Sequence, residues 1–171
     1  MKFLKTKTTH IAAILFLALT ALSCSGSDDD NNDPDVPGGA QGSFFAKINS
    51  TDFNPEFKTG FYEEISDVYI LTGSTGNGEL IQLLIGAELG VGSYPLGEAS
   101  GDNRVIAYYQ ISEGDADQVA AFATSGTVTL TKVDTDNSEI AGTFSFSGTI
   151  LPSGEVYTVT EGAFSLDVSN L

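Results

Sequence analysis

The sequence contains very little cysteine, histidine, tryptophan or positive charge. Its 171 residues include one cysteine, Cys24, one histidine, His10, and no tryptophan. A single cysteine excludes a disulfide within the chain. A chain cleaved just before Cys24 would also lack histidine, which excludes Ser-His-Asp and Cys-His catalysis and zinc sites built from these residues. We therefore expect a protein that is not an enzyme and that holds no cofactor and no metal.

Acidic residues outnumber lysine and arginine by 23 to 7. Three of the lysines precede Cys24 and every Asp and Glu follows it, so the cleaved chain has four cations, 23 carboxylates and a formal charge of −19. Nucleic-acid binding requires basic side chains along the phosphates. The composition therefore argues against a nucleic-acid partner. Because copies of such an acidic chain repel one another, it also predicts a soluble monomer.

An apolar run stands near the N-terminus, at residues 11–22. As a helix it would span about 18 Å, which is less than the roughly 30 Å of a bilayer's hydrocarbon core. The residues before it, MKFLKTK, carry three lysines, as the first part of an export signal does. We therefore predict that residues 1–23 are a cleaved signal peptide rather than a transmembrane anchor.

The end of this run, Ala21-Leu22-Ser23-Cys24, resembles the lipobox of bacterial lipoproteins. It departs from the usual pattern in having Ala21, where most members have leucine, with Leu22 one place later. The resemblance implies that Cys24 is lipidated, with a diacylglyceryl group on sulfur and an acyl chain on the new amino group. Three acyl chains would hold the protein on a membrane far more firmly than one acyl chain. The alternative is an ordinary signal peptide beside an incidental cysteine.

The segment after the cysteine, residues 24–42, is rich in Asp, Pro and Gly and has almost no aliphatic side chains. It cannot bury enough apolar area to offset the entropy of ordering, so we predict a disordered linker. Its first part resembles the acidic export signal of Bacteroidota-type lipoproteins, which directs them to the outside of the outer membrane. The alternatives are a plain spacer and an anchor on the periplasmic face. The residues of this resemblance are Ser25, Ser27, Asp28, Asp29 and Asp30.

Residues 43–171 alternate apolar and polar side chains with a period of two, which is typical of strands. Consecutive strands joined by short turns predict an antiparallel, all-β domain rich in meanders, either a β-sandwich or a partly open β-barrel. Residues 80–87 are apolar on both faces, which predicts a central strand, whereas residues 113–123 favour a loop or one helical turn. The strands are predicted at residues 44–48, 52–57, 67–72, 80–87, 90–97, 104–111, 126–133, 139–150, 156–160 and 164–168.

The order of short motifs along this domain resembles a family of small Bacteroidota lipoproteins that carry a domain of unknown function. The resemblance covers the whole β domain, but its motifs consist of alternating strand residues interrupted by glycines. It therefore implies a fold and identifies no catalytic residues. The motifs are FAKIN at 45–49, GSYPL at 92–96, SGTVTLTK at 125–132, GTFSF at 142–146 and TEGAF at 160–164.

Two acidic clusters have the oxygen spacing of calcium loops. In the first, Asp134, Asp136, Ser138 and Glu139, an EF-hand would need glycine at the sixth position and glutamate at the twelfth, and both are missing. A solvated hairpin turn explains it better. The second cluster spans residues 113–117, and Asp102-Asn103 could join either one in space. Paired carboxylates also serve glycoside hydrolases, although no pair here is distinguished by its neighbours.

Six tyrosines could offer a platform for a ligand. Tyr108 and Tyr109 are adjacent in a predicted strand, so they must point to opposite faces, and one of them is expected to be exposed. Either could contact a ligand. The alternative is that both rings pack against the sheet with the hydroxyl group in water.

Together these observations predict a lipid-anchored surface protein of the outer membrane that presents a non-catalytic β domain for binding or adhesion. Its partner would be a glycan or a protein. One alternative is a calycin-like barrel with a small apolar ligand in its lumen. The other is a carboxylate-dependent glycan hydrolase.

Overall fold

The computed structural model describes residues 40–97, 104–113 and 117–169, without the side chains of residues 112, 113, 117 and 118. All of them belong to residues 31–171, the second of two units into which the chain divides. The predicted signal peptide, Cys24 and the acidic export signal lie outside the described residues, and so does most of the predicted linker. The described part has no helix that could span a membrane.

The described residues form ten strands of one sheet and confirm the predicted all-β fold. Asn49 and Ser50, both with positive φ, form the two-residue turn of the first hairpin. The strands are β1 (Ser43–Ile48), β2 (Thr51–Phe53), β3 (Phe57–Glu63), β4 (Val68–Ser74), β5 (Leu80–Gly86), β6 (Gly92–Gly97), β7 (Val105–Glu113), β8 (Asp117–Asp134), β9 (Glu139–Ile150) and β10 (Val156–Ser169).

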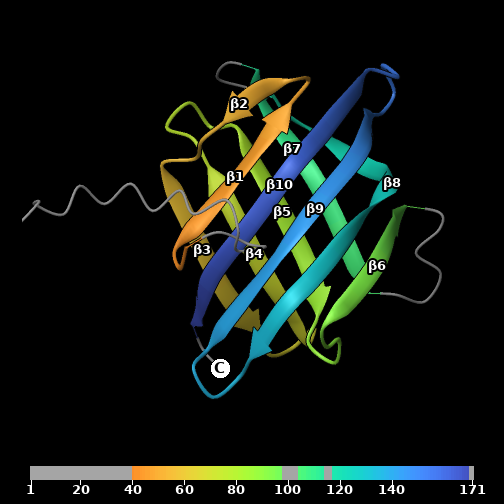
Figure 1. Cartoon of the computed structure of the whole chain (residues 1–171). Helices are drawn as coiled ribbons and strands as arrows, with labels where there is room; N and C mark the ends of the chain where they lie inside the picture. Colours follow the sequence, from red (N-terminus) through yellow and green to blue (C-terminus); the bar gives the residue numbers. More distant parts are fainter. Residues whose placement is uncertain (1–39, 98–103, 114–116, 170–171) are drawn as a thin grey trace, which may run out of the picture. The chain divides into compact units, whose positions relative to one another are not determined.

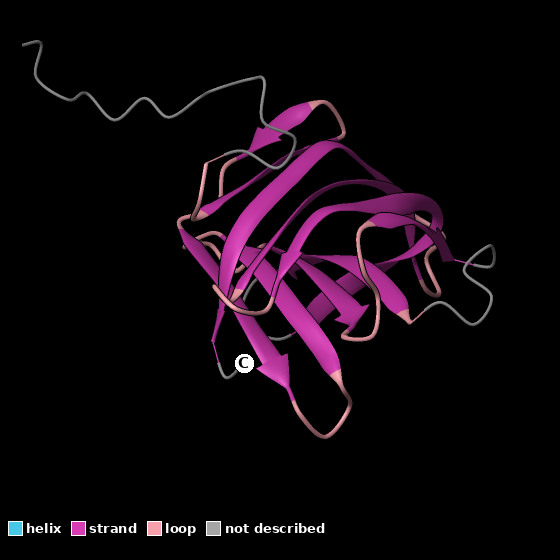
Figure 2. Ribbon diagram, turned by 60° about the horizontal axis from the view of Figure 1, so that its bottom comes forward, coloured by secondary structure: helices cyan, strands magenta, loops and turns pink. Residues whose placement is uncertain are grey.

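The sheet folds into two layers that curve around one interior and partly close into a barrel (Figures 1 and 2). The front layer runs β2-β1-β10-β9-β8-β6, and the back layer runs β3-β4-β5-β7. One edge of the long strand β8 pairs with β9 from Ala121 to Asp134, while its other edge pairs first with β7 and then with β6. β10 is split in the same way between β1 and β3. The structure therefore combines the two predicted alternatives, since a sandwich of two layers is joined along both sides.

The barrel closes on one side through a short parallel contact between β10 and β3. Val168 pairs with Gly60 and Ser169 pairs with Phe61, which is the one parallel pairing among the described strands. A Cβ on Gly60 would lie 2.7 Å from the carbonyl oxygen of Asp167 and 3.3 Å from Leu71 Cδ2. Glycine at this position is therefore what lets β10 approach β3 closely enough to pair.

Several sequence predictions differ from the structure. The described part of residues 113–123 is not a helical turn, because from residue 117 onward it extends β8 and pairs with β7, where Ala121 is buried. The two strands predicted at residues 156–160 and 164–168 are one strand, β10. Residues 52–57 are the ends of two strands, β2 and β3, separated at Pro55. The periodicity did not indicate the rest of β3. Its inward positions include Lys58 and Gly60, which are not apolar, so the strand lacks the expected alternation. β6 also leaves the meander, because it pairs only with β8.

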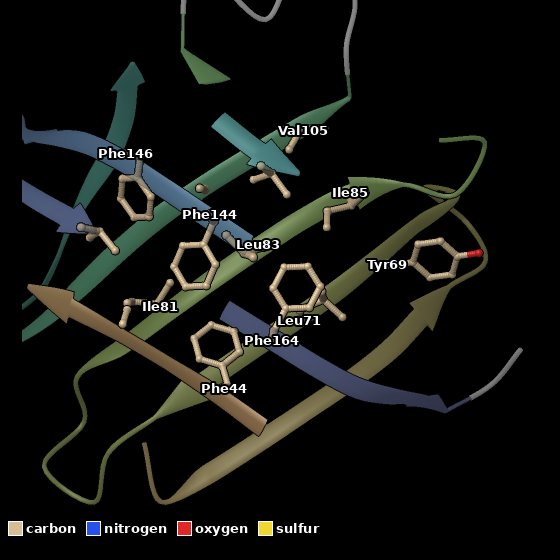
Figure 3. Packing of buried hydrophobic residues seen from close by; sticks show 14 of the residues in the cluster. Phe44, Tyr69, Leu71, Ile81, Leu83, Ile85, Val105, Phe144, Phe146 and Phe164 are labelled. Carbon is tan, nitrogen blue, oxygen red and sulfur yellow. The ribbon is translucent and has the colours of Figure 1, made fainter. Parts of the chain in front are cut away.

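The interior is filled by side chains from both layers (Figure 3). Phe144 lies at its centre, with its ring centroid 5.4 Å from that of Phe44 and 6.2 Å from that of Phe164. These rings come from the front layer and pack on Leu71, Ile81, Leu83 and Ile85 of the back layer, all fully buried. Phenylalanine rings occupy the position where a calycin-like barrel would need an open lumen.

Candidate functional site

The back layer has an apolar surface on its outer side as well as on the side that faces the core. In β5 the inward residues Ile81, Leu83 and Ile85 are fully buried, whereas Leu80 and Leu84 point outward and are only partly covered. The register aligns such outward residues of β3, β4, β5, β7 and the start of β8 into three rows, which we call the outer face. The rows are Phe57-Ser74-Leu80-Gln110-Ala120, Thr59-Thr72-Gln82-Tyr108-Phe122 and Phe61-Ile70-Leu84-Ile106.

Large apolar side chains of the outer face are open to solvent. Phe57 is 60% exposed, Phe122 is 55% exposed and Ile106 is 51% exposed. Ile106 and Phe122 lie close together at the β7–β8 end of the face, and Phe57 lies at the β3 end. Exposed apolar groups of this size that gather on one face are a feature of interaction sites.

The outer face carries no charge although the chain is strongly acidic. Among the described side chains of these strands that point outward, Glu63 alone is ionised, and it lies beyond the third row at a corner. Its carboxylate accepts hydrogen bonds from the amides of Ile65 (3.1 Å) and Ser66 (2.6 Å) in the turn to β4. The positions on the face itself are apolar, hydroxyl or amide side chains.

The front layer differs, since its outward side chains are mostly small and polar. Along β9 they are Thr143, Ser145, Ser147 and Thr149. A hydrogen bond of 2.9 Å joins the hydroxyl groups of Ser93 and Thr129 across two neighbouring strands. This is the solvated face of an ordinary antiparallel sheet, so the two layers present chemically different surfaces.

Tyr108 lies at the centre of a polar chain that crosses the outer face. Its hydroxyl donates to Gln82 Oε1 at 2.6 Å, and Gln82 Nε2 donates to Thr72 Oγ1 at 2.9 Å. Its ring packs against Phe122, with the centroids 5.3 Å apart. Partial burial raises the pKa of the Tyr108 phenol above its ordinary value, so the group is neutral at physiological pH. These bonds hold Tyr108 and Gln82 in one orientation on the surface.

Tyr109 points to the opposite side of β7, as the alternation of strand side chains requires. It is 4% exposed, its hydroxyl donates to Glu79 Oε1 at 2.8 Å, and its ring lies 5.3 Å from that of Tyr157. Burial, followed by the bond to Glu79, raises the pKa of Tyr109 strongly. The structure therefore separates the two tyrosines, and only Tyr108 belongs to the outer face.

A small cleft lies at one edge of the outer face, where β8 leaves β7 and begins to pair with β6. Its volume is about 130 Å³, and Ile106 and Phe122 of the outer face form part of its wall, together with Leu96 and Gly97 of β6. Residues 98–103, which join β6 to β7, lie outside the described residues. The cleft therefore marks where the flat part of the outer face ends.

The acidic cluster after β8 is a hairpin turn, as predicted, with a cation beside it. The carboxylate of Asp134 accepts bonds from the amide (3.0 Å) and the side-chain nitrogen (2.8 Å) of Asn137. Lys132 Nζ lies 2.5 Å from Glu139 Oε2 and 3.7 Å from Asp134 Oδ2. The bonds from Asn137, together with Lys132, lower the pKa of Asp134. No group of three or more potential metal ligands occurs in the described part of the chain.

The same contacts also bear on the alternative of a carboxylate-dependent glycan hydrolase. Asp134 and Glu139 share Lys132, and the surface pocket beside them has no room for a water molecule. A glycoside hydrolase needs one carboxyl group that stays protonated through a raised pKa, whereas the pKa of Asp134 is lowered. Asp67 and Glu88 are likewise both paired with Arg104, at 3.7 Å and 3.2 Å. The other acidic candidates, residues 113–117 and Asp102-Asn103, have no described side chains.

The family model of a domain of unknown function, DUF6252, matches residues 40–166. The chain belongs to the DUF6252 family. The match begins at the first described residue and ends within β10, so the DUF6252 domain coincides with the described β domain. No curated protein and no solved structure matches the chain.

Sequence reasoning missed the outer face of this DUF6252 domain, although one signal was present. The stretch LIQLLIGA at residues 80–87 is apolar on both faces, which predicts a strand covered on both sides. β5 is indeed central in its layer, but only its inner side is covered. An apolar strand without a second covering layer is the pattern that identifies such a surface.

Proposed function

We propose that this DUF6252 chain is a lipid-anchored lipoprotein of the outer membrane that faces the cell exterior and presents a non-catalytic β domain for binding. The observation that carries the binding role is the uncharged, apolar outer face on an otherwise acidic domain. Depletion of charge and enrichment in aromatic residues distinguish the core of a protein interface from the rest of a surface. A protein surface is therefore a better match for this face than a glycan.

The anchor rests on the sequence around Cys24. The lipobox-like Ala21-Leu22-Ser23-Cys24 and the acidic residues after it match the pattern of Bacteroidota-type lipoproteins. Covalent lipid suits this chain because a formal charge of −19 opposes electrostatic binding to an anionic membrane. The non-catalytic role is supported by the described carboxylate pairs, which are neutralised by Lys132 and Arg104.

The anchor is tested by expressing the full chain and Cys24→Ala with labelled fatty acid, followed by membrane fractionation. We expect the wild-type chain to be labelled and in the membrane fraction, and the variant to be unlabelled and soluble. A Cys24→Ala chain that stayed in the membrane fraction would contradict the anchor.

The direction of export is tested by a second variant, in which Asp28, Asp29 and Asp30 are all replaced by alanine. This chain should still be labelled with fatty acid but should become protected from protease added to intact cells. Equal cleavage of this variant and the wild-type chain would contradict the export role of the acidic residues.

A further inference from the structure

We propose that the occupant of the outer face is a second copy of this chain, bound with its own outer face in a two-fold symmetric dimer. The inference deepens the proposed binding role of this face and does not depend on the lipid anchor. It rests on where the charge lies, on the area of the face and on the way in which two sheets pack face to face.

The distribution of charge selects a second copy. Two copies carry the same negative charge, so any contact between them must avoid bringing carboxylates together. The three rows of the outer face meet this requirement, because their described side chains include no carboxylate. Two described carboxylates lie just beyond the third row. Glu63 is bonded to the amides of Ile65 and Ser66, and Glu88 lies over Gly86 and is paired with Arg104. A cationic partner would instead be drawn to carboxylates, which lie elsewhere, as at Asp134 and Asp136 in the turn after β8. The overall acidity suggests a monomer, but the distribution of that acidity leaves one face free of repulsion.

The area of the outer face is sufficient for a weak dimer. Five strands about 4.8 Å apart, with three rows about 6.6 Å apart, give a face of about 24 Å by 20 Å, or about 480 Å². Two copies would then cover about 960 Å², close to the roughly 1,000 Å² that separates a stable interface from a weak or transient one. An interface of this size is at the low end, so we expect a dissociation constant on the order of micromolar or weaker.

The geometry of the face also suits its own copy. Two sheets pack face to face about 10 Å apart with their strands nearly aligned. The exposed side chains of Phe57, Ile106 and Phe122 stand above partly covered neighbours such as Ile70 and Leu84, so each copy offers both protruding and recessed apolar groups. A two-fold axis through the face would pair each residue with a different residue of the other copy and would bring only residues beside the axis onto their own equivalents.

The test uses the chain from residue 24 onward with Cys24→Ser, which contains every described residue, in sedimentation equilibrium from micromolar to millimolar concentration. We expect a monomer–dimer equilibrium that tightens as salt increases, because salt screens the repulsion between acidic copies and the interface has no ion pairs to weaken. A chain that stays monomeric at millimolar concentration overturns the proposal. If that monomer binds neutral phosphatidylcholine vesicles, the face is a lipid-binding surface instead.

Two opposite variants then identify the face. Ile106→Glu with Phe122→Glu, and Ile106→Lys with Phe122→Lys, should each weaken the dimer about tenfold or more, because each pair would bury two unpaired charges in an uncharged interface. An unchanged circular dichroism spectrum distinguishes this weakening from misfolding. Val91→Glu with Phe45→Glu is the matched control, since Val91 is 68% exposed and Phe45 is 40% exposed away from the outer face. A dimer that both opposite variants leave intact overturns the proposal.

The test of the dimer can fail independently of the test of the lipid anchor. A monomeric chain that still reached the membrane through Cys24 would overturn the dimer and leave the anchored, surface-exposed protein in place. A dimer whose Cys24→Ala form remained in the membrane fraction would do the reverse.

Discussion

Tyr108 on β7 and Phe122 on β8 lie directly opposite each other, with ring centroids 5.3 Å apart, on the outer face of the sheet. The Tyr108 hydroxyl is held by Gln82 at 2.6 Å, so the ring pair is fixed from one side. Phe122 is 55% exposed in the described part of the chain. The chain thus orders two aromatic side chains at a position where the fold of one copy gains little from burying them.

A double-mutant cycle should detect this ring pair in the free energy of unfolding. Tyr108→Ala and Phe122→Ala should be coupled by about 0.5–1.5 kcal/mol, the range of aromatic pairs. Tyr108→Ala with Phe45→Ala is the matched control, because Phe45 lies on β1 in the front layer and the two effects should add. Denaturant unfolding in dilute solution measures both cycles. Additive effects in the first cycle would mean that the rings do not interact.

The parallel contact between β10 and β3 should depend on Gly60. Gly60→Ala should destabilise the domain by about 1–3 kcal/mol, since the new methyl group would meet the Asp167 carbonyl oxygen at 2.7 Å. Gly90→Ala is the control, because a Cβ there would have no neighbour within 4 Å. Thermal unfolding of the two variants gives the comparison. Equal stabilities would show that the closure does not need a glycine at position 60.

Two of the central phenylalanines, Phe144 and Phe164, should differ sharply from the exposed Phe45. Phe164 is fully buried and Phe144 is 3% exposed, so replacing either by alanine should cost about 3–5 kcal/mol in the free energy of unfolding. Phe45→Ala, on the solvent side of β1, should have a much smaller effect. Chemical denaturation measures all three variants. A small loss at Phe144 or Phe164 would mean that the interior is open rather than packed.

The turns after β3 and β8 should make the domain sensitive to acid. Hydrogen bonds from the Ser66 side chain and amide lower the pKa of Glu63, and bonds from the side chain and amide of Asn137 lower that of Asp134. The unfolded chain therefore binds more protons than the folded one around pH 4. The stabilisation is complete above the ordinary carboxyl pKa values and is lost as the pH falls through the lowered ones.

The difference in stability between the wild-type chain and a double variant isolates the effect of Glu63 and Asp134 from that of the other carboxylates. Glu63→Gln with Asp134→Asn should be less stable than the wild-type chain at pH 7, and the gap should narrow as the pH approaches 3. Melting temperatures measured across this range give the result. A gap that stayed constant with pH would contradict the role assigned to these two turns.

The sequence predicted the fold class and most of the strands, because the alternation along β9 and the end of β10 directly reports which side chains face the core. It could not predict β3, because Lys58 and Gly60 stand at inward positions and interrupt the alternation, although the strand pairs along its whole length with β4. It also could not predict that residues 117–123 extend β8, since their strand conformation comes from pairing with β7. Pairing with a neighbouring strand is not visible in local periodicity.

The candidate site illustrates a similar limit. Adjacent tyrosines in a strand must point to opposite sides, and this much follows from the sequence. Which of them is exposed depends on the face that packs on Phe144 and its neighbours. The apolar character of residues 80–87 was visible, but whether a second layer covers their outer side is a property of the whole topology.

The central claim is that the outer face of β3, β4, β5 and β7 is where this domain meets its partner. Methyl resonances in two-dimensional ¹H–¹³C spectra, recorded from dilute to concentrated protein, test it most directly. We predict that the signals of Ile70, Leu84 and Ile106 shift with concentration while those of Val91 and Leu151 stay fixed. Signals that do not change at any concentration, or changes confined to residues outside the outer face, would contradict the account.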